Sequence, residues 1–126
     1  MAWEFKNGVP IYLQIITGVK IRIACGDMPP GSKVPSVRDL AQQAGVNPNT
    51  MQRALTQLEQ DGLLYTQRTS GRYITEDEEK MTELRRSLSD GYIEELFTNL
   101  ERLGLTRTQI LDEVRAWAEK EEGEES

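Results

Sequence analysis

Residues 36–75 read SVRDLAQQAGVNPNTMQRALTQLEQDGLLYTQRTSGRYIT, and this stretch decides the fold. Ala41, Gly45 and Met51 have the spacing of a small residue, a turn glycine and a buried apolar residue across two crossed helices. Ala41 allows a close approach of the helices, and Gly45 supplies the backbone freedom of a tight turn. The pattern predicts a helix-turn-helix, whose second helix enters the DNA major groove. Three-helix cores of proteins that bind no DNA can look similar, so the flanking sequence matters.

Capping residues mark the start of both helices. Ser36 is a favourable N-cap, and Asp39 follows three residues later in a capping-box-like arrangement. Asn47 can cap the second helix, with Pro48 at its first position. The residues predicted to face inward are Val37, Leu40, Ala41 and Ala44 of the first helix, and Met51, Ala54, Leu55 and Leu58 of the second.

The opposite face of the second helix is polar and carries Asn49, Gln52, Arg53 and Thr56. Amide, hydroxyl and guanidinium groups are those that read base edges and phosphates. An ordinary solvated helix face is the alternative.

A short hairpin follows directly. The segment LLYTQ is apolar and β-prone, Arg68-Thr69-Ser70-Gly71 is a turn, and Arg72 begins the returning strand. Gly71 lets the backbone approach a surface closely. A basic hairpin after a recognition-type helix is typical of a wing that lies along a groove or phosphate backbone, although a purely structural hairpin is the alternative.

Two amphipathic helices are predicted in the second half. The first carries Met81, Leu84, Leu88, Tyr92, Leu96, Leu100 and Leu103 at steps of three and four, widened by Ile93 and Phe97. Gly104 ends it, and Thr106 with Gln109 predicts a capping box for the second, which carries Ile110, Leu111, Val114, Trp117 and Ala118.

Two helices of this size form no independent core. They either pack on the first domain or pair with a second copy, and we favour a symmetric dimer. A ligand pocket at Tyr92 and Trp117 is a weaker alternative. The predicted dimerisation residues are Leu84, Leu88, Tyr92, Leu96, Leu100, Leu103, Val114 and Trp117.

Charge is unevenly distributed along the 126 residues. The formal net charge is −6, yet residues 1–75 carry +3 and residues 76–126 carry −9. A mildly basic half beside an acidic half indicates a binding module joined to another part. Ahead of residue 36, Pro10 predicts the start of a helix that carries Tyr12, Ile15, Ile16, Val19 and Ile23 and ends by Gly26.

The single Cys25 excludes an internal disulfide and favours a reducing, cytoplasmic location. It closes an apolar stretch, which predicts a buried or half-buried structural thiol, with a redox switch as the alternative. There is no histidine, which removes the usual acid–base group at neutral pH and, with a single cysteine, disfavours a zinc site. We expect no metal, cofactor or catalytic residue. The acidic run 76–79 suits a helix start better than a cation site. Neither a membrane-spanning run nor a signal-peptide pattern is found.

The whole pattern resembles the GntR family of bacterial transcription regulators, and the short helical tail resembles its YtrA-type branch. The matching residues are Pro10, Ile11, Tyr12, Gln14, Ile15, Pro30, Gly31, Val34, Pro35, Ser36, Arg38, Leu40, Ala41, Val46, Asn47, Thr50, Arg53, Ala54, Leu55, Leu58, Gly62, Leu63, Leu64, Gly71, Tyr73 and Ile74, and then the run 103–106.

This resemblance implies a winged helix that dimerises through C-terminal helices, an operator with two related half-sites, and usually repression. Arg38, Thr50 and Gly71 match family positions in the DNA interface. Many members carry arginine where this chain has Pro48 and Gln52, so base readout there does not carry over. Gln52 would favour adenine over guanine.

We therefore expect a mainly α fold with a small β-hairpin. It would comprise a winged helix-turn-helix DNA-binding domain at 1–75 and a two-helix C-terminal dimerisation extension at 76–126, which is also the region for any effector. The predicted DNA-binding residues are Ser36, Arg38, Asn47, Asn49, Thr50, Gln52, Arg53, Arg68, Ser70, Gly71 and Arg72.

The expected partners are double-stranded DNA and a second copy of the chain, with a small-molecule effector as an open option. The expected mechanism is steric repression by a dimer on its operator. A protein-interaction module is the main rival, favoured if the arginines scatter over the surface. A small enzyme is a third option, disfavoured because no nucleophile–base pair is evident.

Overall fold

The structure is a computed structural model that describes residues 3–125, with side chains to Lys120. The elements in this range are α1 (Ile11–Ala24), α2 (Val37–Ala44), α3 (Pro48–Gln60), β1 (Leu64–Gln67), β2 (Gly71–Ile74), α4 (Glu78–Arg102) and α5 (Arg107–Glu125). The chain forms two compact units, Met1–Arg85 and Arg86–Ser126. The predicted domain boundary at residues 75 and 76 precedes α4, whereas the two units divide inside this helix.

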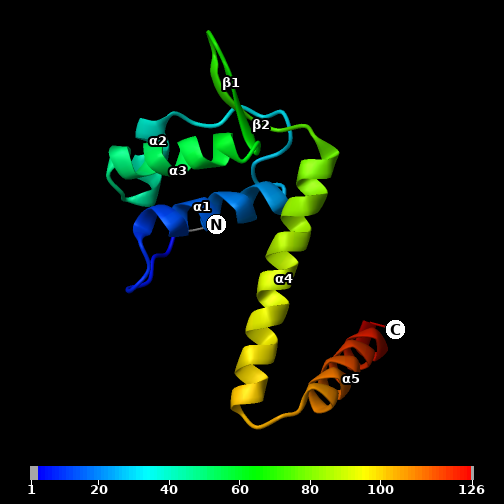
Figure 1. The fold of residues 1–126 in the computed structure, drawn as a ribbon. Coiled ribbons are helices and arrows are strands. Elements are labelled where there is room, and N and C mark those ends of the chain that lie inside the picture. The colour runs from blue at the N-terminus through cyan, green and yellow to red at the C-terminus, as the bar shows by residue number, and fades with distance from the viewer. Residues whose placement is uncertain (1–2, 126) are drawn as a thin grey trace. The chain divides into compact units, whose positions relative to one another are not determined.

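Helix α3 is the centre of the first unit, where it packs against α1, α2 and β1 (Figure 1). All four residues of its predicted apolar stripe are fully buried: Met51, Ala54, Leu55 and Leu58. From α1, Ile15, Val19 and Ile23 are buried as well, and Leu40, Ala41 and Ala44 are the buried residues of α2. Because every buried stripe faces this core, the polar side of α3 is left on the surface.

The predicted caps are formed. The Ser36 hydroxyl accepts a hydrogen bond from the Asp39 N–H at 3.1 Å, and the Asn47 side chain accepts one from the Asn49 N–H at 2.8 Å. Gly45 takes the left-handed conformation, with φ of 71°, between the two helices. Since a side chain at that φ is strained, Gly45 fixes the turn that orients α3. The predicted helix-turn-helix is confirmed.

The hairpin of β1 and β2 is antiparallel, with Leu64 opposite Ile74 and Gln67 opposite Gly71, and it extends away from the three helices (Figure 1). A third segment, residues 31–34, lies along the other edge of β2. The Val34 N–H donates to the Arg72 carbonyl at 2.9 Å, and the Ile74 N–H donates to the Ser32 carbonyl at 2.9 Å. The connector between α1 and α2 therefore braces the wing, which the sequence pattern had not indicated.

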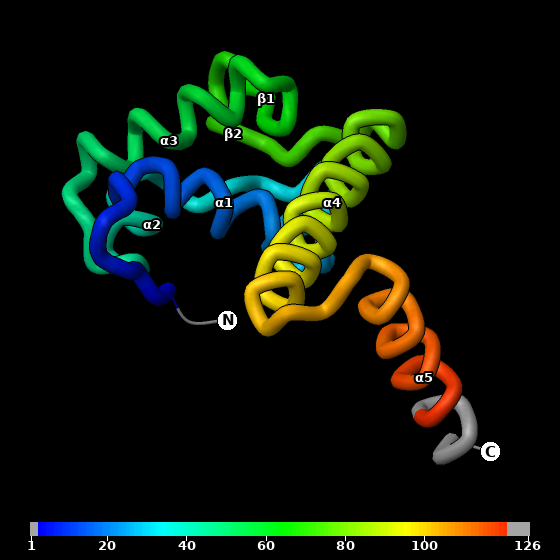
Figure 2. The backbone as a smooth tube through the Cα atoms, turned by 60° about the horizontal axis from the view of Figure 1, so that its bottom comes forward, coloured from blue at the N-terminus to red at the C-terminus, as the bar shows by residue number. Residues whose placement is uncertain are grey.

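The second unit consists of the larger, C-terminal part of α4, a short turn and α5 (Figure 2). Gly104, with φ of 93°, follows the end of α4, as predicted. Thr106 and Gln109 form the predicted reciprocal capping box, with hydrogen bonds of 2.8 and 3.2 Å. Among the side chains described in this unit, Ile110 alone is buried. By itself, the unit has almost no core.

The prediction for Cys25 is wrong, because its side chain is exposed. The apolar stretch that suggested burial belongs to α1, whereas Cys25 is the C-cap residue just after it. There the chain leaves the core-facing helix, and the thiol donates a hydrogen bond to the Arg22 carbonyl at 3.6 Å.

Candidate nucleic-acid interface

The exposed face of α3 presents the side chains predicted to read DNA. Asn49, Gln52, Arg53 and Thr56 are all exposed, on the side opposite the buried stripe. Gln52 donates from Nε2 to the Thr56 hydroxyl at 3.1 Å, which orients its amide along the helix surface. Thr50, in the first turn, is half-buried. A helix with this polar face and a capped N-terminus has the form that enters a major groove.

Arg53 extends from α3 to α1. Its guanidinium carbon lies 3.6 Å from the centroid of the Tyr12 ring, close enough for a cation–π contact. Beside this pair is an open hollow of about 420 Å³, lined by Ile11, Tyr12, Asn49, Thr50 and Arg53. The exposed face of α3 thus continues onto the first turn of α1.

The wing carries one arginine in its turn and another in its returning strand, β2. Arg68 lies in the turn and is exposed, whereas Ser70 is half-buried and donates its hydroxyl to the Gln67 side chain at 3.2 Å. Gly71 has φ of 109°, a conformation that favours glycine. Arg72 donates from Nε to the carboxylate of Glu59 on α3 at 3.0 Å. Strand β2 of the wing is therefore tied to the recognition-type helix.

The ion pair also changes the acidity of Glu59. The hydrogen bond from Arg72 lowers the pKa of the Glu59 carboxyl below its usual value of 4.5, and a hydrogen bond from Thr66 acts in the same direction. Both partners favour the charged carboxylate. At neutral pH the ion pair is present, and the remaining N–H groups of Arg72 can still donate to a ligand.

The other predicted residues lie at the helix starts. Ser36 and Asn47 are the N-cap residues of α2 and α3, and Arg38 is exposed on the first turn of α2. The structure brings together Arg53 with Tyr12, and Arg72 with Glu59. Among the described residues, no hydrogen bond or ion pair joins the side chain of Arg38 or Arg68 to another predicted residue.

Two candidate residues were missed by the sequence reasoning. Lys33 is exposed and lies beside the wing, with its Cε 3.5 Å from where a Cβ at Gly71 would stand. Tyr12 lies under Arg53. Their roles depend on contacts between segments distant in sequence, and the basic character of Lys33 was the only signal available beforehand.

The predicted dimerisation residues fall into three groups by exposure. Leu84 is buried within the first unit, and Leu88 and Leu100 are half-buried. The exposed ones are Tyr92, Leu96, Leu103, Val114 and Trp117, and Ile93 and Leu111 are exposed beside them. For helices in water, this is a large uncovered apolar surface.

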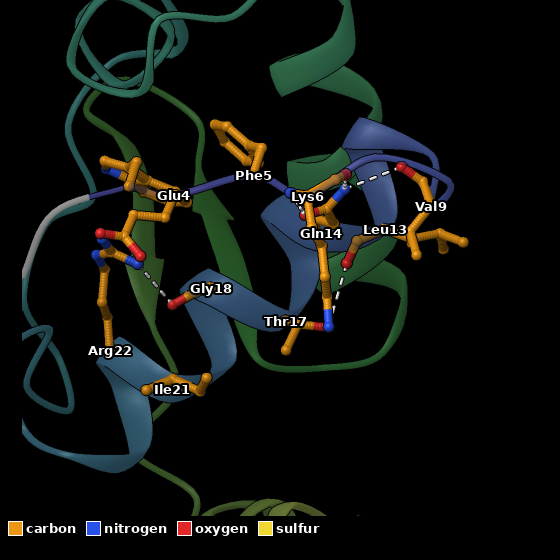
Figure 3. Close-up of a pocket in the computed structure, with 11 residues that line it drawn as sticks. Glu4, Phe5, Lys6, Val9, Leu13, Gln14, Thr17, Gly18, Ile21 and Arg22 are labelled. Atoms are coloured by element: carbon orange, nitrogen blue, oxygen red, sulfur yellow. Dashed lines mark hydrogen bonds between the residues drawn. The ribbon is translucent and has the colours of Figure 1, made fainter.

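A second hollow, of about 450 Å³, lies between α1 and the extended N-terminal segment (Figure 3). Gln14 holds this segment in place: its Oε1 accepts from the Lys6 N–H at 2.8 Å, and its Nε2 donates to the Lys6 and Val9 carbonyls, each at 2.9 Å. The guanidinium carbon of Arg22 lies 3.7 Å from the centroid of the Trp3 ring. None of the predicted site residues lines this hollow.

The described residues offer neither a metal-binding cluster nor a membrane-spanning helix. No group of three or more acidic or cysteine side chains could hold a metal ion there. No described helix combines the length and apolar character needed to cross a bilayer.

Comparison with protein families matches residues 11–74 to the family described as "Bacterial regulatory proteins, gntR family". A relative named "HTH-type transcriptional repressor YtrA", from Bacillus subtilis (strain 168), is 38% identical over 102 residues, which cover 76% of this chain and 78% of that protein.

Solved structures show the same fold. A GntR family transcriptional regulator from Listeria monocytogenes is 34% identical, with a TM-score of 0.78 over 92% of this chain and 98% of that one. The AraR DNA-binding domain in complex with operator ORX1 is 28% identical, with a TM-score of 0.53 over 60% of this chain and 99% of that one.

Proposed function

Because the chain belongs to the gntR family of bacterial regulatory proteins, we propose that it represses transcription by binding, as a homodimer, an operator with two half-sites. It is a DNA-binding transcriptional regulator with a winged helix-turn-helix, similar to the YtrA-type members of the family. The observation that carries the proposal is the exposed polar face of α3 beside a wing with one arginine in its turn and one in β2.

In this proposal, α3 lies in the major groove, where Asn49 and Gln52 contact base edges. An amide pairs best with adenine, so we expect adenine in each half-site. Thr50 and the cap residues Ser36 and Asn47 lie at the helix starts, where they can approach phosphates. Arg38, Arg53, Arg68 and Arg72 supply the charge, and Ser70 and Gly71 bring the wing backbone close to the duplex.

The homodimer is supported by the exposed apolar surface of the second unit. A two-helix unit with one buried residue among its described side chains cannot remain stable alone in water. A second copy offers the same surface, and a two-fold axis would cover both at once. Residues 76–126 would then be the dimerisation part, and residues 1–75 the DNA-binding part.

Repression would be steric. A dimer on its operator excludes polymerase from an overlapping promoter, and a signal that changes the separation of the two α3 helices would release it. The YtrA relative is named a repressor. We also propose that the chain acts in the cytoplasm, without catalytic activity. A small-molecule effector would act through the helical part.

Selection of binding sites from random DNA tests the proposal. The expected result is a pair of related half-sites in inverted orientation, with adenine within the bases contacted by α3, and inhibition of transcription in vitro from a promoter that overlaps the site. Enrichment of a lone half-site would contradict the dimer. Absence of any enriched sequence would favour the protein-interaction module.

A further inference from the structure

Tyr12 forms a fixed platform beside α3. It is the second residue of α1, whose buried residues Ile15 and Ile16 anchor the helix in the core. Just before it, the chain is held by the hydrogen bonds between the Gln14 side chain and the backbone of Lys6 and Val9. With both sides fixed, the backbone that carries the ring is held in place.

Arg53 rests on this platform with its donors unused. The guanidinium carbon is 3.6 Å from the ring centroid, a distance at which the planar group lies against the ring face. Across the described residues, no hydrogen bond or ion pair of the Arg53 side chain is found. Since an aromatic face occupies none of the N–H groups, all five donors remain available along the guanidinium edge. Arg72, in contrast, already donates to Glu59.

The surroundings of the pair suit an anion. The hollow beside it is lined by Asn49 and Thr50, which belong to the first turn of α3. The positive end of the helix dipole lies there, and no acidic side chain lines the hollow. The guanidinium and the dipole favour the same kind of ligand, a phosphate of the DNA backbone.

We propose that Tyr12 is a positioning residue for DNA binding: its ring holds the Arg53 guanidinium over the hollow, oriented toward a backbone phosphate. This rests on the proposed DNA interface and adds a residue from outside the helix-turn-helix. The stack restricts a long, flexible side chain before DNA arrives, so less conformational entropy is lost on binding. The tyrosine hydroxyl has no part in this role.

The test compares Tyr12→Leu, Tyr12→Phe and Arg53→Ala, and combines Tyr12→Leu with Arg53→Ala. Binding is measured by fluorescence anisotropy on the operator obtained by selection and on a random duplex of equal length. Tyr12→Phe keeps the ring and should bind within about twofold of the wild type. Tyr12→Leu should weaken binding to both duplexes by about 2- to 5-fold per half-site, as loss of one cation–π contact predicts.

The combined variant separates positioning from general damage. In the Arg53→Ala background, Tyr12→Leu should have no further effect, because its only route to DNA is through the guanidinium. Arg53→Ala should also reduce the slope of log affinity against log salt by about 0.9 per half-site, the value for one phosphate. Arg53→Lys keeps the charge but not the planar stack, so DNA binding by this variant should no longer depend on Tyr12. This variant replaces Tyr12→Leu in the test if Tyr12→Leu folds poorly.

Several results would overturn the inference. Equal losses for Tyr12→Phe and Tyr12→Leu would assign the contact to the hydroxyl. A Tyr12→Leu effect that persists without Arg53 would show that the ring has a structural role. Unchanged DNA binding by Tyr12→Leu would show that the ring has no role in binding. A loss confined to one base pair would place Arg53 on a base. If the wild-type chain bound neither duplex, the proposed DNA interface itself would fail.

Discussion

Replacing Trp117 with alanine should shift the monomer–dimer equilibrium toward the monomer. The residue is 66% exposed within one chain, so the chain's own fold depends little on it. A tryptophan buries about 150–250 Å², and two-thirds of that is about 100–165 Å². At about 25 cal/mol per Å², covering this area stabilises the dimer by up to about 2.5–4 kcal/mol for each copy. Because a two-fold interface contains the residue twice, we expect at least a 100-fold rise in the dissociation constant.

Sedimentation equilibrium over about three decades of concentration measures this constant. Leu13→Ala is the matched control, because Leu13 is also an exposed apolar residue, at 42%, but lies on α1 in the first unit. Thermal unfolding of the two variants at a dilution where both are monomeric should agree closely with the wild type. A dissociation constant for Trp117→Ala within threefold of the wild-type value would remove Trp117 from the interface and refute the reasoning.

Three further predictions concern the first unit. Arg68→Ala, at the wing tip, should weaken binding to specific and random DNA alike and reduce the salt slope by about 0.9 per half-site, measured by anisotropy at several salt concentrations. Gln52→Ala should relax the preference at one base pair per half-site by roughly 1–3 kcal/mol; an unchanged consensus after selection from random DNA would contradict this. Glu59, whose folded pKa is lowered by Arg72, should stabilise the fold fully above pH 4.5 and lose that contribution as the pH falls through the lowered pKa. Glu59→Gln should therefore flatten the decline of melting temperature below pH 4.5, and parallel curves for both proteins would argue against the ion pair.

The helix-turn-helix could be predicted closely because its signals are local. Ser36 and Asn47 each accept a capping hydrogen bond from a residue at most three positions away. The left-handed φ of the turn requires glycine at position 45 itself. The capping box of Thr106 and Gln109 is equally local. For the buried stripe of α3, helical periodicity was sufficient, since a single core covers one face.

Other features depend on partners that are distant in sequence. The bracing of β2 by Ser32 and Val34 joins segments about forty residues apart, and no periodicity marks it. The same holds for the cation–π contact of Arg53 with Tyr12 and for the ion pair of Arg72 with Glu59. These contacts determine which N–H donors each arginine has left for a ligand. The stripe of α4 shows the reverse case: periodicity identified an apolar face but could not say what covers it.

Native mass spectrometry of the chain with its selected operator tests the central claim most directly. A duplex with two half-sites should carry two protein chains, with no complex of one chain at any ratio below saturation. A duplex with one half-site scrambled should lose most of its affinity, because the second α3 then gains only non-specific contacts. A single chain bound tightly to either duplex would contradict the account.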